Sequence, residues 1–377
     1  MMDLKLLAQL MGVSLPIFSA FYCLILLFIN LYFNKQDVFT FRLSYLLAIF
    51  YVMEIVNIVA VFLSIVFRDF TIYADPVFFF TSLLIPVLLY HIFFKITRLR
   101  TAEQFNFWHY CLPFIFLIFT CICMLLIPVD FFYSTNREIE VHYKYKWYDF
   151  FLTRLIPHIR FLFSIFYLLL SFIRVFNYRK KLQEYSADTD ASSLAWVYKL
   201  FFCLSLQYFF TFINHLFLAG SILDSSVIAI RSTLVVILNS ILCCNIFSKN
   251  FFLLTEDIIF QEKDKISDEV IPGNPIDPVV FEEYMDAEKP YLSHDLKITD
   301  LMAPLGTNRT YLSNFINQYY GMNFSTFINT YRMHEIEALR SDPYYKDFEE
   351  EELVYTVGFK SVKSYQRTKH IISELKG

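Results

Sequence analysis

The stretch 305–329 near the C-terminal end combines short polar side chains at helical spacing, and it reads LGTNRTYLSNFINQYYGMNFSTFIN. A helix over 308–320 would carry five polar residues on one face and apolar residues on the other. The polar face holds Arg309, Thr310, Ser313, Asn314 and Asn317. Short amides and hydroxyls suit base edges in a major groove, and arginine suits phosphates. An ordinary solvated helix face is the alternative interpretation.

A second set of chemically capable residues lies inside long apolar runs. Glu54, Arg160 and His215 are its main members. Charge buried in a bilayer is costly and often marks function. We expect Glu54 and Arg160 to pair across helices or to line a ligand cavity, and His215 is a further candidate for sensing. Interhelical bonds that only fix the packing are the alternative.

Other chemistry is not indicated. The chain contains no HExxH, no GxSxG and no nucleotide-binding loop, and no Cys or His spacing suggests a metal site. The seven cysteines all lie in apolar runs, as small packing residues do. We therefore expect neither an enzyme nor a cofactor.

The elements that must position these residues are of two kinds. The chain is 56% hydrophobic and 18% charged, whereas a soluble domain carries about a quarter charged residues. A bilayer-spanning helix takes about 20 largely apolar residues. Seven such runs are predicted, at 9–33, 41–66, 77–95, 107–128, 151–174, 197–219 and 228–248. Residues 1–250 are thus expected to form a seven-helix transmembrane bundle.

The distribution of Lys and Arg predicts the orientation of this bundle. With the N-terminus outside, the inner loops 34–42, 95–106 and 174–199 hold 10 basic residues. The outer loops 67–76, 129–149 and 220–231 hold 5. The bias favours an outside N-terminus, and seven spans then leave the C-terminal part in the cytoplasm.

The composition changes after the last span. Residues 251–287 are charged and proline-rich, which predicts a linker with a short helix near 279–292. Beyond it, 298–305 reads as a helix, and Gly306 permits a turn before the helix at 308–320. Gly321 ends that helix. A long amphipathic helix from Phe324, a short one at 349–356 and a last one after VGFKS are predicted to follow.

The motifs of this tail resemble a known family. LGTNRTYLSNFINQYYGMNFSTFINTYRMHEIEALR resembles the first half of the DNA-binding domain of AraC-type transcription regulators, and ELVYTVGFKSVKSYQR resembles the second half. The resemblance covers residues 288–377, and family members with an N-terminal membrane bundle are known in bacteria. It implies two helix-turn-helix units joined by a long linking helix, with both recognition helices on one face of the duplex.

The resemblance also implies site residues. The first recognition helix would contact DNA through Thr310, Ser313, Asn314 and Asn317. The second would use Val362, Lys363 and Arg367. Asn308 and Ser361 would cap the two helices, with backbone N–H groups near phosphates.

The tail departs from the family pattern at several positions. Met302 and Val354 stand where a small alanine is usual, Lys369 stands at a core aromatic position, and Pro304 lies near the end of the first helix. From residue 288 onward there are 11 Lys or Arg and 12 Asp or Glu, whereas DNA-binding domains tend to be basic. These features indicate weak affinity of a single copy, and dimerisation would raise it.

The sequence therefore predicts an all-α protein of the bacterial inner membrane, a transcription regulator that binds double-stranded DNA through a cytoplasmic tail. We expect it to act as a homodimer, with a small-molecule or protein signal at the transmembrane domain. One alternative is a membrane receptor or assembly protein whose degenerate tail binds protein. Another is a transporter or membrane enzyme with a regulatory tail.

Overall fold

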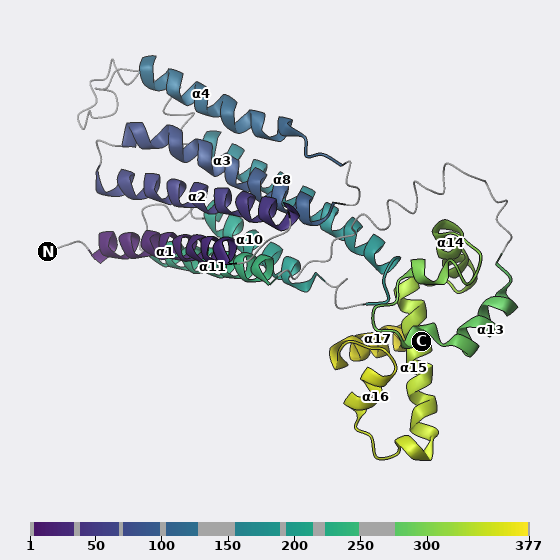
Figure 1. Cartoon of the computed structure of the whole chain (residues 1–377). Coiled ribbons are helices and arrows are strands. Elements are labelled where there is room, and N and C mark those ends of the chain that lie inside the picture. Colours follow the sequence, from purple (N-terminus) through teal and green to yellow (C-terminus); the bar gives the residue numbers. More distant parts are fainter. Residues whose placement is uncertain are drawn as a thin grey trace. The chain divides into compact units, whose positions relative to one another are not determined.

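The computed structural model of the chain describes residues 4–33, 38–67, 71–98, 103–126, 155–188, 194–213, 223–248 and 276–375 (Figure 1). The regular elements within these ranges are all helical, as predicted. The residues form two units. The membrane unit comprises Met1–Thr97, Gln104–Arg174 and Ala195–Phe251, and the tail unit comprises Arg98–Glu103, Val175–Leu194 and Phe252–Gly377.

The membrane unit is built from long apolar helices. They are α1 (Leu4–Phe33), α2 (Val38–Val66), α3 (Thr71–Ile96), α4 (Cys111–Leu126), α8 (Ile156–Gln183), α10 (Ala195–Ile213) and α11 (Leu223–Phe247), with a 3-10 helix η2 (Phe107–Tyr110) before α4. The last turns of α8, from Val175 onward, belong to the tail unit. Within the described residues, six helices are long and apolar enough to cross a membrane, so a membrane protein is indicated. The apolar helix in the predicted span 107–128 is shorter, covering Phe107–Cys123.

Many large apolar side chains of these helices face outward. On α1, Phe18 is 70% exposed and Phe28 is 62% exposed, and on α8 Leu162 is 66% exposed. Helices with apolar residues on all sides need an apolar environment on all sides, which a bilayer supplies.

Contacts between α3, α4 and α8 define the direction of each helix. The Arg160 guanidinium carbon lies 4.4 Å from the centre of the Phe78 ring, and that of Arg174 lies 4.0 Å from the Phe94 ring. Residue numbers rise together in these two pairs, so α3 and α8 are parallel. Phe114 of α4 lies 5.1 Å from Phe80 of α3, centre to centre, whereas Phe105, just before α4, lies near Tyr90. Segment 105–114 therefore runs antiparallel to α3.

Close packing and polar bonds hold the bundle together. Helices α1 and α11 lie side by side (Figure 1), and a Cβ on Gly12 would come within 2.6 Å of the Ile228 Cγ2 atom. The Asn57 side chain of α2 donates to the Thr81 Oγ1 atom of α3 at 2.8 Å. The Tyr51 hydroxyl of α2 donates to the Asn239 carbonyl of α11 at 3.1 Å. Such interhelical bonds fix the register of helices that are otherwise uniformly apolar.

The tail unit contains shorter amphipathic helices. They are α13 (Pro278–Glu288), η5 (Pro290–Leu292), η6 (Ile298–Leu301), α14 (Arg309–Tyr319), α15 (Phe324–Ser341), η7 (Pro343–Tyr345), α16 (Glu350–Thr356) and α17 (Val362–Leu375). Gly306, Gly321 and Gly358 have positive φ angles at the turns between them. The helices predicted from 308 onward are confirmed. We call η6 with α14 the first pair and α16 with α17 the second pair.

The prediction of a regular helix over 298–305 is wrong. Only the 3-10 helix η6, Ile298–Leu301, forms there, and turns continue to Gly306. Pro304 explains the difference, because it has no N–H to bond the carbonyl four residues earlier and it disfavours helical backbone at the residue before it.

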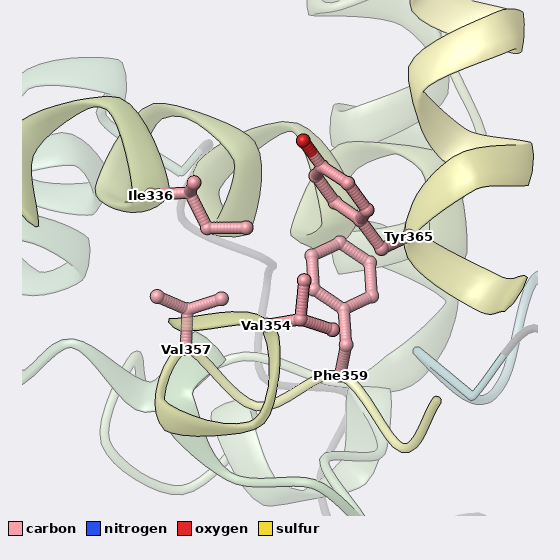
Figure 2. Close-up of a cluster of buried hydrophobic side chains, with 5 residues drawn as sticks. All are labelled: Ile336, Val354, Val357, Phe359 and Tyr365. Atoms are coloured by element: carbon pink, nitrogen blue, oxygen red, sulfur yellow. The ribbon is translucent and has the colours of Figure 1, made fainter. Parts of the chain in front are cut away.

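Two buried clusters form the core of the tail unit. Where the second pair packs against α15, the side chains of a buried cluster are at most 2% exposed and point toward one another (Figure 2). The cluster is Ile336 of α15 with Val354, Val357, Phe359 and Tyr365. Val354, where the family resemblance predicts a small alanine, is part of this core.

The other cluster packs α13 against the first pair and α15. Phe281 of α13 is fully buried, and its ring centre lies 5.2 Å from Phe315 of α14 and 5.6 Å from Phe327 of α15. Helix α13 is therefore a packed part of the tail unit, although its residues fall in the linker predicted at 251–287. Residues 251–275 of that linker lie outside the described residues.

Candidate nucleic-acid interface

Helix α14 has a capped start and a polar outer face. The Asn308 side chain accepts a hydrogen bond from the Tyr311 N–H at 3.0 Å, so Asn308 is the N-cap. Leu312 and Ile316 are fully buried on the inner side. The first N–H groups of any α-helix have no carbonyl acceptor within the helix. They are therefore favourable sites for an anion such as phosphate.

The polar residues predicted for DNA contact share the outer face of α14. Thr310, Asn314 and Asn317 are exposed, and Ser313 is half-buried, with its Oγ atom 3.4 Å from the Asn317 Nδ2 atom. Arg309 is half-buried, and its guanidinium carbon lies 5.8 Å from the centre of the Tyr185 ring. The fold thus brings all five residues to one end or face of one helix, and their contact with DNA stays a prediction.

The second pair presents a smaller polar face. The Ser361 Oγ atom accepts a hydrogen bond from the Ser364 N–H at 3.1 Å, as an N-cap does. Lys363 is exposed, while Val362 and Arg367 are half-buried. Gln366, which the sequence analysis did not single out, is also exposed beside Lys363 and Arg367 on α17. Its spacing of three residues from Lys363 could have identified it, and an amide at this place suits adenine.

Lys369 does not enter the core. It is exposed, and its Nζ atom lies 5.8 Å from the centre of the Tyr365 ring. A long side chain can cover an aromatic face with its methylene groups while its ammonium group stays in water. Lysine at this position, where the family resemblance predicts a core aromatic, therefore places no charge in the core.

The acidic run at the start of α16 has local partners. The Glu352 carboxylate accepts a hydrogen bond from the Glu349 N–H at 3.0 Å, which forms a capping box. Glu350 pairs with Arg340 at 2.7 Å and accepts a hydrogen bond from the Tyr365 hydroxyl at 3.0 Å. These acids stabilise the start of α16.

A buried arginine connects α15 to the chain before the first pair. Arg332 is 2% exposed. Its Nε atom donates to the Tyr291 carbonyl at 2.7 Å, its Nη2 atom donates to the Ser293 carbonyl at 2.6 Å, and its Nη1 atom donates to the Asn329 side chain at 3.1 Å. Burial lowers the pKa of Arg332 to about 10, so the guanidinium remains charged at neutral pH.

The segment 185–188, which follows α8, belongs to the tail unit and pairs with another segment of that unit. We call it the docking segment. Its Ala187 N–H donates to the Leu296 carbonyl at 3.1 Å, and the Ile298 N–H donates to the Tyr185 carbonyl at 3.0 Å. These bonds flank an antiparallel bridge between Ser186 and Lys297. The docking segment thus extends along the chain that leads into the first pair.

Side chains of both pairs and of α15 hold the docking segment. The Asn329 side chain donates to the Ala187 carbonyl at 3.2 Å. Asp188, 9% exposed in its side chain, pairs with Lys360 at 2.9 Å, directly before the capping residue of α17. With the Tyr185 ring near Arg309, the segment contacts residues beside the start of both α14 and α17. These residues fall in the inner loop 174–199 predicted from the sequence, and no signal in that loop predicts their contacts.

The polar residues of the membrane unit come together in a cavity. Glu54 and Arg160 both line a cavity of about 470 Å³ between α1, α2, α3, α8, α10 and α11. Arg231 also lines it, although the sequence analysis placed this residue in an outer loop. The Glu54 Oε2 and Arg160 Nε atoms are buried and have no hydrogen-bond partner among the described residues. His215 lies outside the described residues.

A metal site is not apparent in the part of the chain that the structure describes, where no group of three or more His, Cys, Asp or Glu could hold an ion. Comparison of the chain with protein-family models, with curated proteins and with solved structures finds no match.

Proposed function

We propose that this chain is a membrane-anchored, sequence-specific DNA-binding transcription regulator of the AraC type. The observation that carries the proposal is the outer face of α14, where Thr310, Asn314 and Asn317 are exposed beside a helix start capped by Asn308. Amides and hydroxyls at this spacing can bond base edges, while the helix start faces phosphate. The second pair adds Lys363, Gln366 and Arg367 on α17.

The proposed topology is seven crossings with the N-terminus outside and the tail in the cytoplasm of a bacterium. Parallel α3 and α8 support an odd number of crossings between them, because the chain must return to the starting end between Ile96 and Ile156. Segment 105–114 runs in that returning direction. The excess of Lys and Arg in the loops assigned to the inside supports the orientation.

A selection experiment tests the proposal. Full-length protein in lipid nanodiscs would be incubated with a pool of random duplexes, and the bound duplexes would be amplified and sequenced over several rounds. A shared sequence motif is expected at low salt, with affinity falling as salt rises because phosphate contacts release counterions. A forced dimer should enrich the motif more strongly. Absence of any enriched motif in both forms would reject specific DNA binding.

A protein-binding tail is the second candidate function. The near balance of 11 basic and 12 acidic residues from residue 288 onward favours it, because a duplex repels acidic surfaces. The exposed aromatic residues Tyr344, in η7, and Tyr355, on α16, suit a protein partner. Crosslinking in cells separates the two functions: recovery of protein adducts without chromosomal DNA would favour this one.

Coupling of the membrane unit to DNA binding would pass along α8. Arg160 lies near the start of this continuous helix, and the docking segment follows its end. A helix of this length transmits a shift or rotation because its backbone bonds make it stiff. A change in the docking segment would act directly on the residues that lead into α14 and α17.

Replacement of Asp188 by alanine is expected to loosen the docking segment. The substitution removes the ion pair with Lys360, and hydrogen exchange of the Ile298 amide, which donates to Tyr185, should accelerate by about tenfold. Exchange would be measured by mass spectrometry on the full chain in nanodiscs. Asp342→Ala, at the start of η7, is the control and should leave peptides around residue 298 unchanged. Equal exchange in wild type and Asp188→Ala would contradict the coupling route.

A further inference from the structure

The cavity of the membrane unit has the size and the form of a ligand site. Its volume of about 470 Å³ lies within the range of about 300–1,000 Å³ that small-molecule sites occupy. Its walls come from the first half of α1, α8 and α11, at Gly12, Arg160 and Arg231, and from the second half of α2, at Glu54. In the proposed orientation these parts lie toward the outer face of the membrane.

Two neutral polar groups of the cavity wall, Asn57 and Ser232, are bonded within the bundle. The Asn57 amide donates to the Thr81 Oγ1 atom at 2.8 Å and to the Phe78 carbonyl at 3.2 Å. The Ser232 hydroxyl of α11 bonds the Gly12 carbonyl of α1 and the Ile228 carbonyl of its own helix. These groups hold helices in place and have little capacity left for a ligand.

The charged groups of the wall differ in this respect. The Glu54 Oε2 and Arg160 Nε atoms are buried without a hydrogen-bond partner among the described residues. The Arg160 guanidinium carbon lies 4.4 Å from the centre of the Phe78 ring, a cation–π contact that uses no N–H group as a hydrogen-bond donor. The Glu54 carboxylate also interacts with the Asn239 side chain, which leaves its Oε2 atom as the open acceptor. A buried charged group with an open polar atom is costly and often marks function, and a ligand would supply the missing partner.

The charge of the wall selects the sign of the ligand. Two arginines, Arg160 and Arg231, and one carboxylate, Glu54, line the cavity, and a carboxylate ligand would give the Arg160 Nε atom an acceptor. The rest of the wall includes an aromatic set, which suits a flat apolar body. This set is Phe50, Phe78, Phe161, Tyr208 and Phe212.

We infer that the cavity binds a small aromatic carboxylate that carries a hydrogen-bond donor on its ring system. Arg160 binds the carboxylate, the aromatic set packs on the ring, and the Glu54 Oε2 atom accepts the hydrogen bond of the donor. Binding itself is independent of DNA. The role of this ligand as the signal for DNA binding rests on the proposed function.

Two sets of matched probes test the inference on full-length protein in nanodiscs by isothermal titration. One set is 4-hydroxyphenylacetate, 2-(4-hydroxyphenyl)ethanol and tyramine, and the other is indole-3-acetate, tryptophol and tryptamine. Each set keeps one ring and changes the charged group from anion to neutral to cation. In at least one set the acid should bind at least about tenfold more tightly than the alcohol and the amine. Absence of acid preference in both sets would overturn the inference.

Variants of the same arginine locate the site. Arg160→Leu should weaken binding of the preferred acid by at least about tenfold while the alcohol still binds, which shows that the cavity persists. Arg160→Lys keeps the charge and should keep the acid preference at reduced affinity. Arg174→Leu, on the same helix and outside the cavity wall, is the control and should bind as wild type. Unchanged acid binding in Arg160→Leu would also overturn the inference.

The outcomes for the ligand and for the DNA are separable. Titration without DNA measures the cavity alone, and duplex selection measures the tail alone. Loss of acid preference with an intact DNA motif would reject the ligand and leave the regulator, and the reverse result would leave a membrane receptor for an aromatic acid.

Discussion

Replacement of Thr310 and Asn314 together by alanine is expected to weaken binding to a selected duplex by at least about thirtyfold. Each contact to a base edge contributes about 1–3 kcal/mol of discrimination, and two such contacts are removed. Both side chains are exposed on α14, so their loss should not disturb the packing of Leu312 or Ile316. Alanine also has the highest helix propensity, which keeps α14 folded.

The measurement is a salt series of equilibrium binding with the full chain in nanodiscs and the selected duplex. Loss of base contacts should lower affinity at every salt concentration without a change in slope, because phosphate contacts set the slope. The control is His334→Ala with Ser341→Ala, two exposed residues of α15, which should bind as wild type. Equal affinity of both double variants would remove α14 from the interface.

A single variant of the second pair completes the test of the interface. If α17 also enters the groove, Lys363→Ala should reduce the salt slope by about one, as removal of a phosphate contact does. An unchanged slope would restrict DNA binding to the first pair. The acidic run at the start of α16 would favour that outcome, because it repels the phosphate backbone.

Replacement of Arg332 by leucine is expected to destabilise the tail unit by at least about 3 kcal/mol. The variant leaves the Tyr291 and Ser293 carbonyls and the Asn329 side chain without their donor, and each unsatisfied buried group costs about 1–3 kcal/mol. Arg332 is also among the largest fully buried side chains, so a smaller residue leaves unfilled volume.

Hydrogen exchange of the helices α15 and α17 in the full chain measures this effect. Exchange of their most protected amides should accelerate by at least about a hundredfold in Arg332→Leu, since each 1.4 kcal/mol corresponds to a factor of ten. Arg340→Leu is the matched control on the same helix, because Arg340 and Glu350 form a pair that is 46% and 49% exposed in the side chains. Such surface pairs contribute about 1 kcal/mol or less. Similar acceleration in the two variants would show that the buried hydrogen bonds of Arg332 stabilise the tail unit no more than the surface ion pair does.

The sequence by itself was informative where structure is determined locally. An apolar run of sufficient length forms a helix because its backbone groups must bond within the segment when no water is present. The start of α14 at Asn308 follows from one side chain and one backbone N–H three residues away. The polar face of α14 follows from helical periodicity alone, so its residues could be named before the fold was known.

The local sequence pattern and the structure differ where a single residue changes the pattern. The apolar spacing at 298–305 predicts a helix, and Pro304 limits it to the 3-10 helix η6. The family resemblance predicts a core residue at position 369. The flexible side chain of Lys369 lies on the surface instead.

Tertiary structure alone decided the contacts between residues distant in sequence. The bridge between Ser186 and Lys297 joins segments more than a hundred residues apart, and nothing in either segment indicates its partner. The burial of Phe281 shows that α13 belongs to the tail unit, although its surroundings in sequence read as a linker. Glu54, Arg160 and Arg231 share one cavity because three helices converge there. Periodicity reports which face of a helix is apolar, and only packing determines which other face it meets.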